Sequence, residues 1–454
     1  MIDNLTRDEF VRTLHRHVSP TSPIQSQEHL FGRERQMEMV EQALYAPGRS
    51  VFIYGDRGVG KTSLAQTAAY CHQSASHNPI LLACDTSSTF AGVMSGAIRQ
   101  LSDARSERPV TTTHKGAIGY RGFGISGERT THEGVAPRIQ TATDLNEIVT
   151  ELLEVGASRG NENAVIVIDE FDRIADEVER THFADFIKQI GDQRVPIRFI
   201  FCGVAGSMQK LLGAHASCYR YLDGIELKTL TWDARYEIID NVAKALGVRV
   251  EDRPRYRIAA ISDGFPHFIH RMCEQLFWQM FNDPLPCEVP TAGHYQEAVV
   301  RSVQGIEQHL MQTYEQAVMK DAKGYEQVLW AVADHSDMIR NIEGIYQSYL
   351  NIMGNDDDGA EALDRQTVVR RLSALKGSSC GSILSSARSG WYRFSESMMR
   401  GYVRLRAEEQ GLELALDYSA ASRPSPDLAW RQRGARRGKM GTKPQDWEKL
   451  RNPK

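Results

Sequence analysis

The amino-acid sequence predicts an α/β protein whose core is a doubly wound parallel sheet. Short apolar runs, bounded by glycine, proline and polar residues, alternate with segments of helical periodicity along the first half of the chain. A glycine-rich turn joins one run to a helix, and a later run ends in two adjacent carboxylates. Strands separated by helices in this way are typical of a parallel sheet with helices on both faces.

Composition narrows the class of protein. A chain of 454 residues has room for about three domains, and 41% hydrophobic with 25% charged residues is ordinary for a globular protein. No apolar run is long enough to span a membrane, and Met1–Asn4 does not open a signal peptide. The seven cysteines are scattered without a C-x-x-C pair. This pattern predicts reduced thiols, no zinc site and a cytoplasmic location.

The turn after the first strand has the spacing of a phosphate-binding loop. The run Val51–Tyr54 leads into G-x-x-x-x-G-K-T, and a helix is predicted from Ser63 to Cys71. Glycines at this spacing let backbone N–H groups turn toward a polyphosphate, while the lysine reaches the β- and γ-phosphates and the threonine hydroxyl binds Mg²⁺. The helix N-terminus adds a favourable dipole. A nucleoside triphosphate is therefore predicted to bind Gly55, Asp56, Arg57, Gly58, Val59, Gly60, Lys61, Thr62 and Ser63.

A second chemical landmark is the strand that ends in Asp169 and Glu170. The apolar run Ala164–Ile168 fits a fully buried parallel strand. In P-loop nucleotide hydrolases the aspartate at the end of such a strand holds Mg²⁺, which assigns Thr62 and Asp169 to the metal. Glu170 is placed to act as general base on the attacking water. The alternative is that the two carboxylates only cap a helix.

The other core elements follow in order. A helical pattern over Thr6–His17 leads to a linker, and a helix begins after Phe31–Glu34. Further strands are predicted at 79–85, 195–203 and 224–227, and further helices at 89–101, 144–155 and 182–190. Arg33, just ahead of the phosphate-loop strand, is either a nucleotide contact or a surface arginine. Ser207, beyond the strand at 195–203, is a candidate sensor of the γ-phosphate.

Two segments do not fit the pattern of packed elements. Residues 103–142 are rich in Gly, Thr and Arg, and a stretch this long inside a compact domain is usually functional or mobile. It is either a flexible insertion or a hairpin that carries Tyr120, Arg121 and Phe123 toward a nucleic acid or a partner. The tail from Arg423 is basic, which predicts disorder with either a weak, salt-sensitive affinity for polyanions or a solubilising role.

Together these motifs resemble those of AAA+ ATPases, in the branch shared by origin-recognition initiators and STAND signalling ATPases. The matching stretches are 31–34, 51–63, 165–170, 202–207 and 264–267, and the resemblance covers residues 28–405. It implies a nucleotide-binding core over 28–230, an all-α lid over 231–305 and a winged-helix domain over 306–410. An extension, 1–27, and the basic tail, 411–454, flank these domains. The implied cofactors are ATP and Mg²⁺.

The resemblance also implies roles for the lid and for the approach to the last core strand. Three predicted helices, over 232–246, 254–261 and 265–281, fit the lid. Family members often open the third with an arginine that contacts the phosphates. Here His267 occupies that position, a departure that favours the STAND side, and Arg271, one turn later, is the candidate substitute for the phosphate contact. AAA+ assemblies also take an arginine from the neighbouring subunit. Arg220 is the first candidate, ahead of Arg173, and the alternative is a salt-bridged surface arginine.

Residues 306–410 resemble a winged-helix domain. Helices are predicted over 324–335, 345–353, 365–376 and 398–408, with a hairpin formed by 382–386 and 391–394. A winged helix places its third helix in the major groove and its wing on phosphates. The DNA-binding candidates are therefore Arg365, Arg370, Arg371, Lys376, Arg388 and Arg393. The third helix is predicted to pack through Val369, Leu372 and Leu375, which leaves its basic residues largely free. In STAND ATPases this fold often serves only as a packing or partner surface, and that alternative stays open.

Two functions of different classes fit this sequence. In the first, an oligomerising ATPase uses ATP binding and slow, partner-stimulated hydrolysis as a switch on double-stranded DNA, as a loader, initiator, transposition regulator or prokaryotic defence component. Lys61, Glu170 and Arg220 are then its catalytic residues. In the second, a STAND-type scaffold uses ATP to control assembly with a separate effector protein and does not bind DNA. A nucleotide-dependent transcription regulator is a third alternative, and none of the three involves a membrane.

Overall fold

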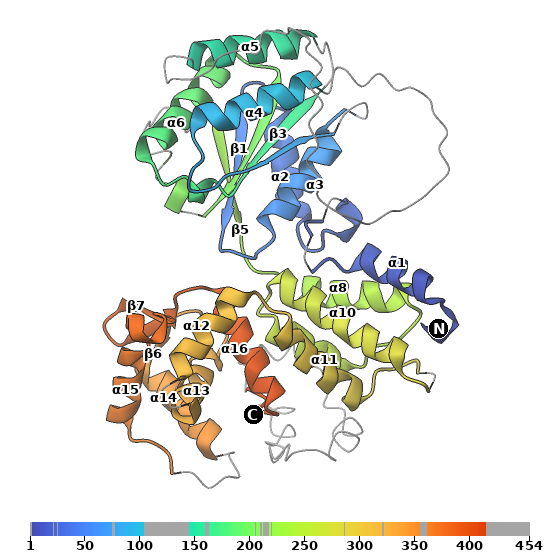
Figure 1. Ribbon diagram of the computed structural model, residues 1–454, viewed down its shortest axis with the longest axis vertical. Helices are drawn as coiled ribbons and strands as arrows, with labels where there is room; N and C mark the ends of the chain where they lie inside the picture. The colour runs from blue at the N-terminus through green and yellow to red at the C-terminus, as the bar shows by residue number, and fades with distance from the viewer. Residues whose placement is uncertain are drawn as a thin grey trace, which may run out of the picture. The chain divides into compact units, whose positions relative to one another are not determined.

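The computed structural model of the chain describes residues 2–103, 145–158, 163–319, 322–354 and 361–414, apart from positions 21, 25, 75–77, 205, 209–210, 212–217, 219 and 286. Backbone contacts separate two units (Figure 1). The sheet unit is formed by Gln36–Tyr54 and Ala65–Glu226, and the helical unit by Met1–Arg35, Gly55–Leu64 and Leu227–Lys454. The phosphate loop thus groups with the helical unit. The predicted insertion and tail lie almost entirely outside the described residues.

The sheet unit is built on strands in the order β2–β3–β4–β1–β5. Their bounds are Ser50–Gly55 (β1), Ile80–Ala83 (β2), Ala164–Asp169 (β3), Ile197–Gly203 (β4) and Leu222–Leu227 (β5). Strands β1 and β3 both pair parallel with β4, and β2 pairs parallel with β3. This order and these directions confirm the doubly wound parallel sheet that the sequence predicts.

Helices cover both faces of this sheet. Their bounds are Glu34–Tyr45 (α2), Lys61–His72 (α3), Phe90–Asp103 (α4), Leu145–Ser158 (α5) and Glu177–Asp192 (α6). On one face, Phe52, Ile166 and Phe199 pack with apolar side chains of α4, α5 and α6 in a single cluster. Alternate residues of a strand point to the opposite face. There, Arg198 of β4 donates to the Leu44 carbonyl at the end of α2, at 2.6 Å.

Helix α6 begins at Glu177, ahead of the predicted start at 182. Asp176 is its N-cap, and the Asp176 carboxylate accepts a hydrogen bond from the Val178 N–H at 2.8 Å. The first turn is exposed and polar on either side of Val178, so it lacks the apolar periodicity on which the sequence prediction relies. The capping aspartate and the acidic residues of the first turn, Glu177 and Glu179, are the local signals of this helix start.

The helical unit combines N-terminal and C-terminal segments. Its elements are η1 (Ile2–Asn4), α1 (Arg7–His17), η2 (Gln27–His29), α8 (Trp232–Ala245), α9 (Asp252–Ile261), α10 (Pro266–Asn282), α11 (Ala292–Gln304), α12 (Gln308–Val318), α13 (Ala322–Ala333), β6 (Arg340–Asn341), α14 (Ile342–Gly354), α15 (Arg365–Ala374), η6 (Ser378–Cys380), β7 (Leu384–Arg388), β8 (Trp391–Phe394) and α16 (Met398–Glu409). The helices predicted for the lid are present as α8, α9 and α10. Within the described ranges, no helix is long and apolar enough to cross a membrane.

Helices α11 and α12 are not predicted from the sequence. At the start of α11, Thr291 and His294 form a capping box, in which each side chain bonds the backbone of the other residue. The usual partner in such a box is glutamate or glutamine, so the histidine conceals the signal. At the start of α12, Glu307 makes no side-chain capping bond. Helix α11 thus has a preferred N-cap, Thr291, but not the usual capping-box partner, and α12 has neither.

The C-terminal part of the helical unit carries a small antiparallel sheet in the order β6–β8–β7. The predicted third helix is present as α15 and the predicted hairpin as β7 and β8. Helix α15 packs through Val368, Leu372 and Leu375, so the prediction of Val369 is wrong. Spacings of four and three keep these residues on one stripe of a helix, whereas two spacings of three drift away from it. The assignment to the winged-helix class remains a prediction.

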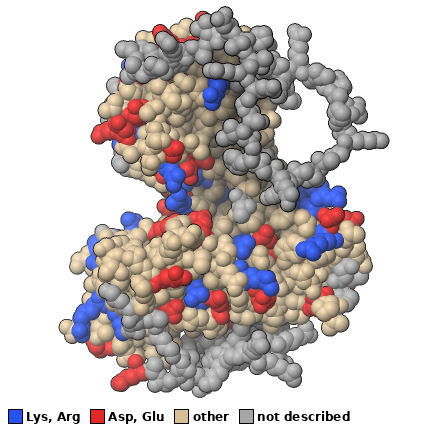
Figure 2. All heavy atoms as spheres, in the orientation of Figure 1, with Lys and Arg blue, Asp and Glu red and all other residues tan. Residues whose placement is uncertain are grey.

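The basic candidates of this part divide into two groups. Figure 2 shows Lys and Arg side chains gathered over the end of the unit that carries α15 and β7. The exposed candidates are Arg365, Arg370, Lys376, Arg388 and Arg393. Arg371 is half-buried, and its guanidinium lies over the Tyr325 ring of α13, 5.4 Å from the ring centroid. The prediction that Arg371 is largely free is therefore wrong, because α13 covers that side of α15.

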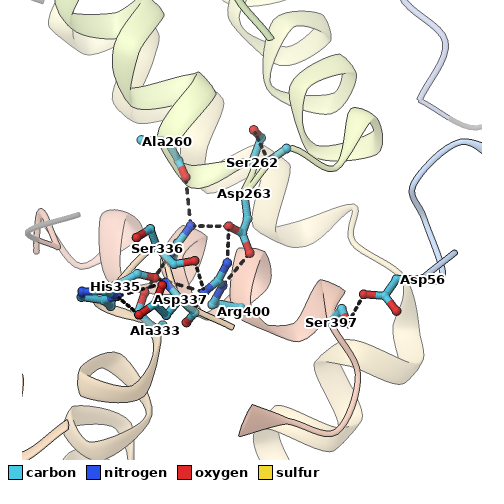
Figure 3. A network of polar contacts seen from close by, with 12 residues as sticks. Asp56, Ala260, Ser262, Asp263, Ala333, His335, Ser336, Asp337, Ser397 and Arg400 are labelled. Carbon is cyan, nitrogen blue, oxygen red and sulfur yellow. Dashed lines mark hydrogen bonds and ion pairs between the residues drawn. The ribbon is translucent and has the colours of Figure 1, made fainter. Parts of the chain in front are cut away.

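A buried ion cluster joins α16 to the turn after α9 (Figure 3). The Asp263 carboxylate accepts hydrogen bonds from Arg400 at 2.6 and 2.7 Å and from Arg404 at 2.9 Å. These three side chains belong to residues that are only 3–6% exposed. Further donors of the two guanidiniums bind the carbonyl oxygens of Ala260, Ala333, His335, Ser336 and Asp337. Each buried charge is thus both paired and hydrogen-bonded, as burial requires.

The cluster also sets the protonation of Asp263. Burial alone would raise the pKa of this carboxyl, but Arg404 and Arg400 outweigh burial and hold the pKa below its usual value. Because the folded pKa is lower than the unfolded one, the charge contributes fully to stability above about pH 4. That contribution is lost as the pH falls through the folded pKa.

We expect Asp263→Asn to lower the free energy of unfolding by about 3–5 kcal/mol, because two buried guanidiniums lose their counter-charge. Urea unfolding of the full chain at pH 7, followed by circular dichroism, measures this loss. Asp240→Asn is the matched control, since it removes the carboxylate of the more exposed pair with Arg255. That control should cost less than about 1 kcal/mol. Equal losses for the two variants would contradict the structural role of the cluster. Below pH 4 the gap between parent and Asp263→Asn should narrow.

Candidate functional site

The predicted phosphate loop connects β1 to α3, and α3 begins at Lys61, two residues ahead of the predicted Ser63. Gly58 and Gly60 have φ angles of +80° and +94°, in the region that favours glycine. The Lys61 ammonium donates to the carbonyl oxygens of Gly55 at 3.1 Å and Asp56 at 2.8 Å. These two bonds draw the lysine back across the loop that precedes it. The lysine therefore helps to fix the shape of the turn in which backbone N–H groups would face a phosphate.

Arg33 is buried and binds the same loop from outside. Its guanidinium donates to the Val59 carbonyl at 2.9 Å and to the Lys228 carbonyl, just after β5, at 2.7 Å. Burial lowers the pKa of Arg33 to about 10, so the side chain stays protonated at neutral pH. This placement excludes the surface-arginine alternative. Arg33 ties the phosphate loop to the segment that follows the last strand, and its direct contact with a nucleotide remains a prediction.

Other residues of the phosphate loop are bonded by segments that are distant in the sequence. Val59 is buried, whereas Asp56 and Arg57 are exposed. The Ser63 hydroxyl accepts a hydrogen bond from the Ile24 N–H at 3.2 Å, which ties the N-terminal segment to the start of α3. The Asp56 carboxylate accepts a hydrogen bond from the Ser397 hydroxyl at 2.7 Å (Figure 3). The loop is thus contacted by segments that precede it and follow it in the sequence.

In the sheet unit, Asp169 and Glu170 lie where β3 ends. The Asp169 carboxylate accepts a hydrogen bond from the Glu170 N–H at 2.8 Å. Glu170 has a φ of 53°, a left-handed conformation that is uncommon for a residue other than glycine. Its side chain is 43% exposed, lies 3.5 Å from the Arg173 guanidinium and makes no capping bond to the short helix η4 (Phe171–Arg173). The helix-cap alternative is therefore not supported for Glu170.

A local negative field surrounds these carboxylates. Burial, followed by the charges of Asp169, Asp85 and Glu170, raises the pKa of the neighbouring Cys84 thiol to about 12. Burial is the largest cause of this shift, and the neighbouring carboxylates add to it by disfavouring a further negative charge beside them. Among the described residues, no group of three or more His, Cys, Asp or Glu side chains forms a metal-binding cluster.

Strand order places the carboxyl ends of β1 and β3 at one edge of the sheet. Strand β4 lies between β1 and β3, with Tyr54 paired to Gly203 and Ile168 paired to Phe201. The three strands are parallel, so their carboxyl ends reach the same edge, which is where ligands of such sheets bind. Ser207 follows β4 and is buried, with its hydroxyl donating to the Val204 carbonyl at 2.6 Å. Its predicted role as a phosphate sensor remains a prediction.

The other predicted site residues have diverse environments. The His267 Nδ1 atom lies 2.9 Å from the Pro20 carbonyl oxygen, so the N-terminal segment contacts the start of α10. The Arg271 guanidinium donates to Glu274 at 3.0 Å and to the Arg301 carbonyl at 3.2 Å, which engages it at the end of α11. This engagement does not support Arg271 as a substitute phosphate contact. Arg220 is exposed just ahead of β5, and its role across a subunit boundary remains a prediction.

Comparisons with known proteins agree with the motifs. Residues 29–200 match the family model described as the AAA ATPase domain, a segment that contains both the phosphate loop and Asp169–Glu170. None of the proteins of curated function matches this chain.

Among solved structures, the Walker-type ATPase of Pyrococcus abyssi is 15% identical, with a TM-score of 0.51, over 84% of this chain and 98% of that one. The ORC2 protein of Aeropyrum pernix is 13% identical, with a TM-score of 0.45, over 87% and 98%. The Thermotoga maritima RuvB branch migration motor is 15% identical, with a TM-score of 0.41, over 86% and 98%. Of these three, the first has the most similar fold, and at this identity it supports the fold alone.

We expect Arg33→Met to weaken ATP binding about tenfold, because two loop-anchoring hydrogen bonds from a charged donor are lost. Titration of the full chain with a fluorescent ATP analogue measures the affinity. Arg35→Met is the matched control, since Arg35 lies two residues later, exposed in the first turn of α2. Arg33→Lys keeps the charge and one donor direction, so it should recover part of the affinity. Equal affinities for Arg33→Met and Arg35→Met would refute the anchoring role.

Proposed function

We propose that this protein is an ATP-binding and ATP-hydrolysing switch of the AAA+ type, which oligomerises and acts on DNA or on a DNA-associated complex. The observation that carries the proposal is the strand order of the sheet. A phosphate loop follows β1, and a pair of carboxylates follows β3, at the edge where both parallel strands end. The match of residues 29–200 to the AAA ATPase domain supports the same activity at the level of the family.

Each part of the proposed chemistry has a residue on this chain. Backbone N–H groups from Gly55 to Thr62 bind the polyphosphate, with Lys61 at the β- and γ-phosphates. The Thr62 hydroxyl and the Asp169 carboxylate are the hard oxygen donors that Mg²⁺ prefers. When bound, this ion neutralises phosphate charge. Glu170 accepts the proton of a water molecule whose oxygen bonds the γ-phosphorus as the bond to the ADP oxygen breaks.

The left-handed backbone of Glu170 supports its role as the base. Residues held in sparsely populated conformations cost about 1–3 kcal/mol and cluster at functional sites. Its partner Arg173 is half-exposed, so this ion pair is weak and leaves the carboxylate available to water. The exposed Arg220 is our candidate for the arginine that a neighbouring subunit contributes. With His267 where family members often have an arginine, we expect turnover to be slow and partner-stimulated.

Action on DNA is supported by the exposed basic residues of α15 and the β7–β8 hairpin. Arg370 bonds only a neighbouring threonine, at 3.3 Å, among the partners described, and Arg388 lies over Trp391 at 4.1 Å from the ring centroid. Both guanidiniums remain accessible to a phosphate. If the fold is a winged helix, these residues fall on its third helix and its wing. The alternative, a scaffold that binds a protein partner through the same surface, predicts no DNA affinity.

We expect Glu170→Gln to keep ATP binding and to lower the turnover rate by about 10²–10⁴-fold, because the amide cannot accept the proton. Steady-state phosphate release measures turnover, and a fluorescent ATP analogue measures binding. Asp172→Asn is the matched control, since it neutralises an exposed carboxylate two residues away and should leave turnover near the parent rate. Lys61→Ala should abolish binding itself. Hydrolysis by Glu170→Gln at the parent rate would exclude Glu170 as the base.

We expect the double variant Arg370→Ala with Arg388→Ala to weaken binding of double-stranded DNA. The slope of log affinity against log salt should fall by about two, one unit for each lost phosphate contact. Lys244→Ala with Arg301→Ala removes the same charge from exposed positions on α8 and α11 and serves as the control. Equal slopes for the two variants would remove these residues from the DNA surface. A parent chain without DNA affinity, whose ATP turnover is indifferent to DNA, would favour the scaffold.

A further inference from the structure

Two residues at the start of α16 contact the phosphate loop directly. The Ser397 hydroxyl donates to the Asp56 carboxylate at 2.7 Å (Figure 3). The next residue, Met398, is buried against Gly58, where a Cβ atom would lie only 2.3 Å from the methionine sulfur. Serine and methionine here are more than 330 positions beyond the loop in the sequence, since the Asp56–Ser397 bond spans 341 positions. No motif of the nucleotide-binding core includes them.

Asp56 is bonded through both its side chain and its backbone carbonyl, and this links Ser397, at the start of α16, to Lys61. Its carboxylate accepts the Ser397 hydroxyl, and its backbone carbonyl accepts the Lys61 ammonium at 2.8 Å. A shift of Asp56 would therefore move one of the two carbonyl oxygens that fix the lysine. The second is the Gly55 carbonyl at 3.1 Å. Ser397 thus acts on Lys61 through a single residue.

The start of α16 is itself held by the buried ion cluster. Arg400, three residues after Ser397, bonds Asp263 and the carbonyl oxygens that follow α13. These bonds fix the first turn of α16 against the turn after α9. The neighbouring Met398 and Met399 are buried as well. A serine at this position has little freedom to leave Asp56 unless the helix start moves with it.

We infer that Ser397 is a positioning residue of the nucleotide site: its hydroxyl holds Asp56, and through Asp56 it sets the phosphate loop and Lys61 for ATP. This inference rests on the proposed function. The C-terminal part of the chain then contributes to ATP affinity without touching the nucleotide. Charge-assisted hydrogen bonds of this type are stronger than neutral ones, and pre-organising a glycine-rich loop lowers the ordering cost of binding.

The test is a double-mutant cycle on the full chain, with affinity for a fluorescent ATP analogue as the readout. Ser397→Ala should weaken binding about fivefold, and Ser397→Thr, which keeps the hydroxyl, should bind within about twofold of the parent. In an Asp56→Ala background, Ser397→Ala should have no further effect, because the partner is gone. Ser395→Ala is the matched control. Its hydroxyl donates to the Ser382 carbonyl at 2.6 Å in the same connection but does not contact the loop.

The outcomes separate this inference from the proposed function. Binding of ATP by the parent, with Ser397→Ala at parent affinity, overturns the inference and leaves the function standing. An equal loss from Ser397→Ala in both backgrounds, or from Ser395→Ala, also overturns it, since the effect would then not pass through Asp56. A parent chain that does not bind ATP, or that binds it equally well after Lys61→Ala, overturns the proposed function itself.

Discussion

The helical unit depends on one buried carboxylate, Asp263, which lies between the guanidiniums of Arg400 and Arg404. Removing each such ion from water costs several kcal/mol, and the mutual attraction repays this only when the geometry is good and the remaining donors are bonded. Both conditions are met here, because the guanidiniums also bind carbonyl oxygens at the end of α13 and after α9. Apolar packing is non-directional, whereas these hydrogen bonds and ion pairs can all form only when α9, α13 and α16 have one particular arrangement. The cluster therefore fixes the start of α16, where Ser397 and Met398 lie.

The phosphate loop shows how a flexible segment is given one shape. Its glycines adopt the backbone conformations that the turn requires, but they also lose the most freedom on ordering. Three side chains offset that loss from separate directions: Arg33 at Val59, Lys61 at two carbonyls and Ser397 at Asp56. The motif supplies the chemistry that phosphate requires. The helical unit around it supplies the conformation.

The sequence predicts well what depends on local pattern. Buried parallel strands appear as uninterrupted apolar runs, and the phosphate loop and the Asp169–Glu170 pair follow two of them, so the sheet and both motifs are correctly placed. The three helices predicted for the lid have clear periodicity and are likewise present, as α8, α9 and α10. Helix α11 escapes prediction because a histidine replaces the usual capping-box partner. On α15, Val369 is predicted in place of Val368 because either valine can be aligned roughly with Leu372 and Leu375. Only the spacing of four residues, from Val368 to Leu372, keeps the apolar side chains on one stripe of the helix.

What the sequence does not reveal are contacts between distant segments. The bond from Arg33 to Lys228 spans 195 positions, and that from Ser397 to Asp56 spans 341. Such pairs leave no local pattern in the sequence. The sequence therefore allows two interpretations of Arg33, a nucleotide contact or a surface residue, and gives no reason to connect Ser397 with the phosphate loop. The prediction that Arg371 is largely free is wrong for the same reason, because its guanidinium lies over the Tyr325 ring of α13.

The ion cluster also limits where the chain can be truncated without separating buried charges from their partners. A cut after α11, where the sequence suggests a domain boundary, would leave Asp263, which has a left-handed φ of 53°, without either guanidinium. It would also separate Arg257 of α9 from the Glu408 carboxylate that it binds, and Tyr295 of α11 from the same group. Helix α16 therefore packs as part of the same helical unit as α9 and α11, although Arg400 follows Asp263 by 137 positions. The smallest fragment that keeps the Asp263 ion cluster must therefore include α16, the last helix among the described residues.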